Sequence, residues 1–116
     1  MEKMQVYGFE MIRIEDISEI VKRERTLLID LRSEESYRKG HIKNARNYPY
    51  ADMEDWREEI PDGISLILYC EHGNLSLLSA KKLRGRKGGI YTLLGGYQEV
   101  AREGAKEGID TVVFKR

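Results

Sequence analysis

The chain has one cysteine among its 116 residues, Cys70, and two histidines, His41 and His72. A single cysteine excludes an internal disulfide and any zinc site built from several cysteines. The histidines would need several carboxylates to complete a four-ligand shell with Cys70. We therefore predict no metal site.

The sequence also lacks long apolar runs and an excess of either charge. No window approaches the roughly 18 apolar residues that span a bilayer, and the first residues have no apolar centre or cleavage site of a secretory signal. Twenty basic residues balance twenty acidic ones, so nothing draws the whole chain to nucleic acid or anionic lipid. We expect no membrane partner, no nucleic-acid partner and a cytoplasmic location.

The composition of the chain fits one folded domain over residues 1–116. Hydrophobic residues make up 41% and charged residues 34% of the chain, as is typical of globular proteins. Residues 81–87, KKLRGRK, form the one strongly basic tract. It has two interpretations, a solvated helix end or a docking patch for an acidic partner.

Short apolar runs alternate with amphipathic patterns along the chain. The runs predict strands at 26–31, 64–70 and 89–94, with weaker candidates at 45–49 and 108–116. Periodicities of three and four predict helices at 14–24, 33–40, 53–60, 75–83 and 96–104. The first ten residues predict a short strand or an arm. Alternating strands and helices indicate a largely parallel sheet covered on both faces.

Four of these helices carry specific expectations. Ser33 and Asp52 are predicted N-caps, and Gly40 is a predicted helix terminator. The faces expected to be buried are Ile14, Ile17, Ile20 and Val21 in the first helix, and Leu75, Leu78, Ala80 and Leu83 in the fourth.

Cys70 stands where a predicted strand turns into a predicted helix. In parallel sheets, ligands bind at this kind of junction, beyond the carboxyl ends of strands. The loop amides and the positive end of the following helix would both favour a thiolate, which is the nucleophilic form of cysteine. A tight turn around the sulfur needs Gly73. The position of Cys70 at this junction favours a functional role. The alternative is a structural role, because free cysteines are often buried in cores for packing reasons alone.

Two neighbours of Cys70 have ordinary and functional interpretations. Ser76 is either a helix N-cap or a hydroxyl supplied to the loop. His72 is expected to be an exposed side chain at the mouth of the pocket, with a general base as the alternative.

Three motifs resemble one known family. Residues 30–49, DLRSEESYRKGHIKNARNYP, are similar to the rhodanese-like signature of Asp-x-Arg, an acidic residue, an aromatic, Gly-His-Ile and Ala-x-Asn-x-Pro. Residues 67–76 resemble its active-site strand and loop, and residues 93–104 its Gly-Gly-aromatic element. Together the resemblance covers about residues 10 to 105, in family order and spacing.

The resemblance implies a three-layer α/β/α fold with a mainly parallel five-stranded sheet, and a sulfurtransferase without a cofactor. Cys70 would take sulfane sulfur from a small donor or a protein persulfide and pass it to a thiol or a cyanide-like acceptor. The loop Glu71, His72, Gly73, Asn74, Leu75 and Ser76 would bind the substrate, with the amides of 71–75 stabilising the persulfide. Asp30 and Arg32 would pair and brace the loops. No oligomeric state is implied.

One departure from the family concerns the donor. The sixth loop position, often arginine in members that use thiosulfate, is Leu75, and the second is Glu71. A charge-assisted contact to a sulfonate contributes about 1.5–3 kcal/mol, so its loss disfavours thiosulfate. Arg32 or Arg84 could replace that contact from outside the loop. A protein persulfide or a small organic persulfide fits the loop better.

Three other functions have some relation to this pattern. A non-catalytic interaction module on the same fold is favoured by the missing loop arginine. A phosphatase would want a longer loop and an arginine to bind phosphate. A redox sensor would use the same thiolate, with a resolving thiol from another molecule.

Overall fold

Five parallel strands form the central sheet of the computed structural model, which describes residues 8–107 and 112–113. Their order is β1 (Glu10–Ile12), β6 (Ile90–Leu93), β5 (Ser65–Tyr69), β2 (Thr26–Asp30) and β4 (Arg46–Asn47). Every residue of β5 is buried, as expected of a central strand covered on both faces. The short edge strand β4 stops just before Pro49, which has no amide hydrogen for a further ladder bond.

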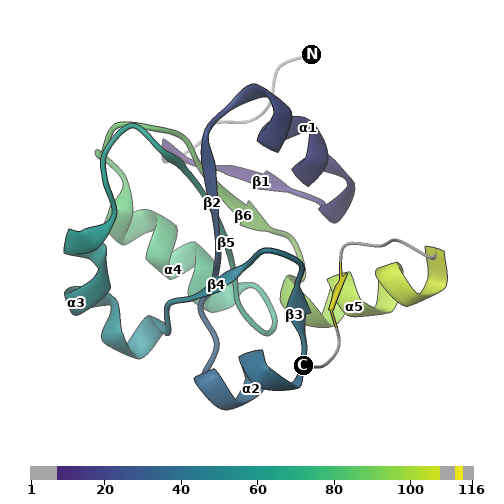
Figure 1. The fold of residues 1–116 in the computed structure, drawn as a ribbon. Helices are drawn as coiled ribbons and strands as arrows, with labels where there is room; N and C mark the ends of the chain where they lie inside the picture. The colour runs from purple at the N-terminus through teal and green to yellow at the C-terminus, as the bar shows by residue number, and fades with distance from the viewer. Residues whose placement is uncertain (1–7, 108–111, 114–116) are drawn as a thin grey trace.

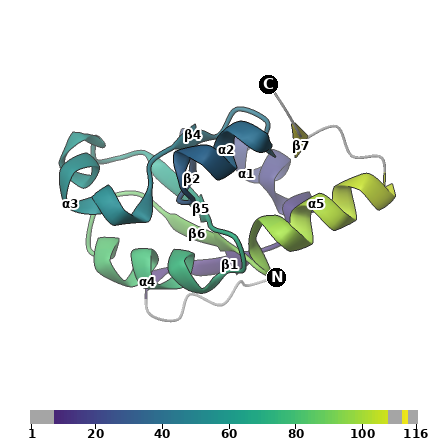
Figure 2. The same ribbon diagram turned by 90° about the horizontal axis from the view of Figure 1, so that it is seen from below.

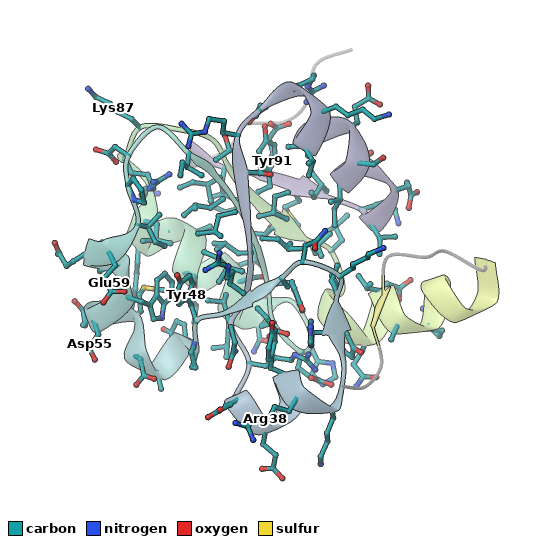
Figure 3. All side chains as sticks on the ribbon, in the orientation of Figure 1. Arg38, Tyr48, Asp55, Glu59, Lys87 and Tyr91 are labelled. Carbon is teal, nitrogen blue, oxygen red and sulfur yellow. The ribbon has the colours of Figure 1, made fainter. Side chains whose placement is uncertain are left out.

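Helices cover both faces of this sheet, so the predicted three-layer α/β/α fold is confirmed. Figure 1 shows α3 (Met53–Trp56) and α4 (Asn74–Leu83) on one side of the strands, with α1 (Ile17–Arg23) and α5 (Gly96–Glu107) on the other. Alternate side chains of β5 enter the two cores. Leu66 and Leu68 pack towards α3 and α4, while Ile67 and Tyr69 pack towards α1 and α5. In Figure 3, Tyr48 lies on the α3 side and Tyr91 on the α1 side.

Shorter elements complete the chain. These are the 3-10 turns η2 (Ile14–Asp16), η3 (Tyr50–Asp52) and η4 (Arg57–Glu59), the helix α2 (Glu34–Lys39), and an antiparallel pair of β3 (His41–Ile42) with β7 (Val112–Val113). Ser33 caps α2 by accepting a hydrogen bond from the Ser36 amide, and Gly40 ends it, both as predicted. Within the described residues, no helix is long and apolar enough to cross a bilayer.

The strand predictions need two refinements. A strand was a possibility for the first ten residues, but β1 begins only at Glu10 and extends to Ile12; residues 1–7 lie outside the described part. The last predicted strand, 108–116, is represented by β7, which pairs with β3 and not with the central sheet. The rest of that segment lies outside the described residues.

Three predictions about helices are wrong. Val21 and Leu78 are half exposed, at 50% and 45%. The buried stripe of α4 is Ser76, Ser79, Ala80 and Leu83, because small side chains let the helix approach the sheet closely. Asp52 precedes α3, but its side chain makes no capping hydrogen bond, since η3 already leads the backbone into the helix.

Candidate active site

Cys70 follows β5 directly and precedes α4 by three residues, at the carboxyl edge of the sheet. Its Sγ accepts hydrogen bonds from the amides of Gly73, at 3.1 Å, and Ser76, at 3.3 Å. The Sγ also lies 4.0 Å from Asn74 Oδ1. Peptide N–H groups that converge on one atom form a nest for an anion, so this arrangement favours a negatively charged sulfur.

The turn that creates this nest depends on Gly73. Its φ is +102°, in the left-handed region that favours glycine. A Cβ at this position would also lie 3.4 Å from the Gly95 amide nitrogen, so the loop sits tightly against the turn before α5. The requirement for glycine at this position was predicted from the sequence.

Ser76 has neither the position nor the contact of an N-cap. The helix begins two residues earlier, at Asn74, with Gly73 as its N-cap residue. The Ser76 hydroxyl donates a hydrogen bond to the Gly73 carbonyl, 3.1 Å away, and its amide points to the sulfur. The N-cap interpretation is therefore wrong, and Ser76, in the first turn of α4, supplies its hydroxyl to the loop and its amide to the sulfur.

The sulfur is more enclosed than the sequence suggested. Cys70 is 1% exposed and belongs to the core cluster on the α3–α4 side of the sheet, against which Leu75 also packs. Glu71 and Gly73 are half-buried, while His72 and Asn74 are exposed, as expected for His72. The surrounding residues therefore cover Cys70 almost completely.

A groove whose lining contains no Asp, Glu, Lys or Arg lies beside this loop. It runs between the loop, the first turn of α4 and the end of β6. The residues that line it are Met11, His72, Gly73, Asn74, Leu77, Thr92, Leu93, Leu94 and Gly95. Gly73 is shared between the groove and the sulfur nest, so the groove borders the site from the β6 side.

Asp30 and Arg32 form a buried ion pair at the end of β2, the neighbour of β5. Arg32 Nη2 lies 2.8 Å from Asp30 Oδ2, and Nε lies 3.0 Å from Oδ1. Arg32 Nη2 also donates to the Gly40 carbonyl at 2.6 Å, which ties the end of α2 to the sheet. Burial opposes the charge of Arg32, but the hydrogen bonds and negative charge of Asp30 outweigh it and raise its pKa.

Tyr69 extends this ion pair into the core. Its hydroxyl donates to Asp30 Oδ2 at 2.7 Å and accepts from the Ile42 amide at 3.1 Å. Burial, followed by the Asp30 charge, raises the pKa of Tyr69, so it stays a neutral donor. The Asp30 carboxylate is thereby satisfied inside the protein, which fits the bracing role expected for Asp30 and Arg32.

Glu71 contacts Arg32 and α5. Its Oε1 lies 3.4 Å from Arg32 Nη1, and its Oε2 accepts a hydrogen bond from Gln98 Nε2. Burial opposes ionisation of Glu71, but the hydrogen bonds from Gln98 and Arg32 and the charge of Arg32 lower its pKa below the ordinary value. Glu71 is therefore an anion whose two oxygens are both engaged by protein donors.

Sequence reasoning missed Tyr69, Tyr97 and Gln98 as members of this site. The Tyr97 ring covers the Arg32 guanidinium, whose Cζ atom lies 3.9 Å from the centroid of the ring. Burial raises the pKa of Tyr97. The Gly-Gly-aromatic element pointed to Tyr97 as a feature of the family, without a role. Nothing in the local pattern signals Gln98, because its partner Glu71 is 27 residues away.

Comparison with known proteins adds one family and several relatives. The sequence model of the rhodanese-like domain matches residues 14–103. The thiosulfate sulfurtransferase GlpE of Coxiella burnetii is 32% identical over 82 residues, which cover 69% of this chain and 76% of that protein. A tRNA sulfurtransferase of Desulfurococcus amylolyticus is 34% identical over 71 residues, which cover 61% of this chain but 14% of its own length. The crystal structure of a rhodanese-related protein from Thermoplasma volcanium superposes with a TM-score of 0.77 over 92% of this chain and all of that one, at 23% identity.

Proposed function

The chain belongs to the rhodanese-like domain family, and we propose that it is a sulfurtransferase that carries sulfane sulfur on Cys70. The observation that supports this proposal most directly is the pair of amides, from Gly73 and Ser76, that point to Sγ. An anionic sulfur, either the thiolate or a persulfide, makes stronger hydrogen bonds to these donors than a neutral thiol does.

The proposed reaction has two steps. The Cys70 thiolate attacks the outer sulfur of a persulfide donor, R–S–SH, so that a new S–S bond forms between Sγ and that sulfur and the S–S bond of the donor breaks. The donor leaves as a thiolate. A thiolate or cyanide acceptor then attacks the outer sulfur, the bond to Sγ breaks, and the Cys70 thiolate is regenerated. Neither step needs a cofactor or an external oxidant.

The proposed donor is a small organic persulfide or a protein persulfide. Thiosulfate is a dianion, and Glu71 and Leu75 give the loop an anion and no cation. Arg32 does not replace the missing cation, because Asp30, Gly40 and Glu71 already engage it. Arg84 lies at the far end of α4, which is about 15 Å long. The Coxiella relative is named for thiosulfate, so the two proteins would differ in donor preference.

The test is sulfur loading followed by intact mass measurement. The purified chain is incubated with an organic persulfide, and in parallel with thiosulfate. We expect a gain of one sulfur atom that is absent in Cys70→Ala and present in Glu35→Gln, a control at an exposed position on α2. If the wild-type protein gains no sulfur from any of the donors, the proposal is refuted.

The near-complete burial of Cys70, at 1% exposed, favours a second candidate, a non-catalytic interaction module on the same fold. In that case Cys70 is part of the core, and its alkylation requires global unfolding. An alkylation rate that follows the unfolding rate would favour the module. A rate that is much faster than unfolding would favour the sulfurtransferase.

A further inference from the structure

The side chain of Glu71 connects two separate parts of the fold. Its carboxylate accepts a hydrogen bond from Gln98, in the first turn of α5, and lies 3.4 Å from a nitrogen of Arg32, at the end of β2. Arg32 is 7% exposed in its side chain and is fixed by Asp30. The Glu71 side chain is 39% exposed, so water reaches one side of it while protein donors hold both oxygens.

The backbone of the same residues is joined to α5 as well. The Tyr97 amide donates to the Cys70 carbonyl at 2.7 Å, and the Gln98 amide donates to the Glu71 carbonyl at 3.1 Å. These are first-turn amides, which have no acceptor within their own helix. Figure 2 shows the first turns of α4 and α5 side by side at this edge of the sheet. The carbonyls of residues 70 and 71 therefore face α5, while the amides of Gly73 and Ser76 point to the sulfur.

This close approach requires Gly96. A Cβ at that position would lie 2.6 Å from the Cys70 carbonyl oxygen and 2.7 Å from the Glu71 carbonyl oxygen, distances that real structures do not show. Its φ of +66° is also in the left-handed region. The contact between α5 and the loop is thus built into the backbone, and the Glu71–Gln98 side-chain pair adds to it.

We propose that Glu71 is a positioning residue for Cys70 and not a substrate contact. Together with Gln98 and Arg32 it forms a loop clasp, which holds residues 70–71 on α5 and keeps the amides of Gly73 and Ser76 directed at Sγ. This inference deepens the proposed function, since the clasp governs how well the loop stabilises the sulfur anion on which that function depends.

Glu71 could influence Cys70 through the loop clasp or through its negative charge alone, and the two predict opposite shifts in the pH profile of Cys70 alkylation. A carboxylate near the sulfur disfavours a thiolate, so removal of the charge alone would shift alkylation of Cys70 to lower pH. Loss of the clasp would let the amides drift from Sγ, which shifts alkylation to higher pH. Glu71→Gln removes the charge but keeps an oxygen that accepts a hydrogen bond. Glu71→Ala removes both.

The experiment measures the rate of Cys70 alkylation by iodoacetamide between pH 5 and pH 10, in about half-unit steps. The variants are Glu71→Ala, Glu71→Gln and Gln98→Ala, with Glu35→Ala as an exposed control on α2. We expect the midpoint of the pH profile to rise in Glu71→Ala and Gln98→Ala. We expect it to stay at or below the wild-type value in Glu71→Gln, and to stay unchanged in the control.

Sulfur loading from a neutral organic persulfide provides the second readout. Glu71→Ala removes two partly exposed hydrogen bonds of modest strength. We therefore expect its rate of sulfur loading to be about fivefold lower than that of the wild type. Glu71→Gln should keep at least half of the wild-type rate. Thermal unfolding by circular dichroism checks that each variant is folded, and Gln98→Ala tests the clasp if Glu71→Ala does not fold.

Three results would overturn the loop clasp. They are equal downward shifts in Glu71→Ala and Glu71→Gln, an unchanged profile in both alanine variants, or a loading rate in Glu71→Ala equal to that of the wild type. A wild-type chain that takes up no sulfur would refute the proposed function instead. The alkylation profiles would still decide on the clasp.

Discussion

Replacing Leu75 by arginine restores a cation to the sixth position of the loop and tests the proposed donor preference. Leu75 lies in the first turn of α4, beside the Asn74 that approaches Sγ, and is half-buried. A charge-assisted contact to the sulfonate of thiosulfate contributes about 1.5–3 kcal/mol. Solvent reaches this position, so the gain lies near the lower end of that range. We expect Leu75→Arg to raise the rate of sulfur loading from thiosulfate about tenfold.

The substitution also has a cost in stability. Leu75 packs against the core cluster that contains Cys70. An arginine keeps part of that contact with its methylene groups but loses the branched end, which lowers the free energy of unfolding by about 1 kcal/mol. Thermal unfolding measures this loss, so that a change in loading can be separated from a change in the folded fraction.

Leu78→Arg is the matched control, because Leu78 is on the same helix, one turn further from the sulfur, and 45% exposed. Thiocyanate formed from thiosulfate and cyanide reports the rate for both variants and the wild type. The gain in Leu75→Arg should shrink as ionic strength rises. An equal gain in Leu78→Arg, or no gain in a folded Leu75→Arg, would refute the claim that the missing cation sets the donor.

Three further predictions concern buried polar groups and pH. Tyr69→Phe removes the hydroxyl that hydrogen-bonds to both Asp30 and the Ile42 amide. Chemical denaturation should therefore show a loss of about 2 kcal/mol in the free energy of unfolding. A loss below the measurement error would contradict these contacts. Ser79→Ala removes a fully buried hydroxyl that has no hydrogen-bond partner among the described residues. The unfolding free energy of this variant should therefore equal or exceed that of the wild type, and a clear loss would contradict the missing partner. Because the pKa of Glu71 lies below its ordinary value of 4.5, its ionised form stabilises the fold above that pH and the benefit disappears as pH falls through the lowered pKa. Unfolding measured between about pH 6 and pH 3 should therefore show a smaller acid-induced loss in Glu71→Gln than in the wild type, and equal losses would contradict the shift.

The strands were predictable from the sequence for a clear physical reason. Residues 64–70 and 26–31 are short apolar runs, of which the first forms the fully buried β5 and the second forms β2, buried at Ile29 and Asp30. Pro61, Asp62 and Gly63 mark the turn before β5. Helix faces were less predictable. Hydropathy assigns a helix its most apolar face as the buried one, but α4 buries Ser76 and Ser79 and leaves Leu78 half exposed. A small side chain that lets a helix approach the sheet leaves no signal in hydropathy.

The candidate site likewise contains residues that were predictable from the sequence and residues that were not. Cys70 and Gly73 were predictable, because the cysteine and the turn that surrounds it are neighbours in sequence. Gln98 and Tyr97 were not. Their contacts with the loop arise because α5 returns to the same edge of the sheet and because Gly96 permits close approach of the two backbones. Such contacts are properties of the assembled fold and leave no trace in either segment alone.

The burial of Cys70 and its hydrogen bonds lead to one chemical argument. A thiol is a weak acceptor, and a backbone amide that is buried without a good acceptor costs about 1–3 kcal/mol. At Cys70, a residue that is 1% exposed, two amides point to one sulfur. A structural cysteine would leave both donors poorly satisfied, whereas an anionic sulfur would satisfy both at once. The geometry is therefore costly for a neutral thiol and favourable for a thiolate or a persulfide. That difference in free energy is our physical reason for preferring a sulfur carrier over an idle core cysteine.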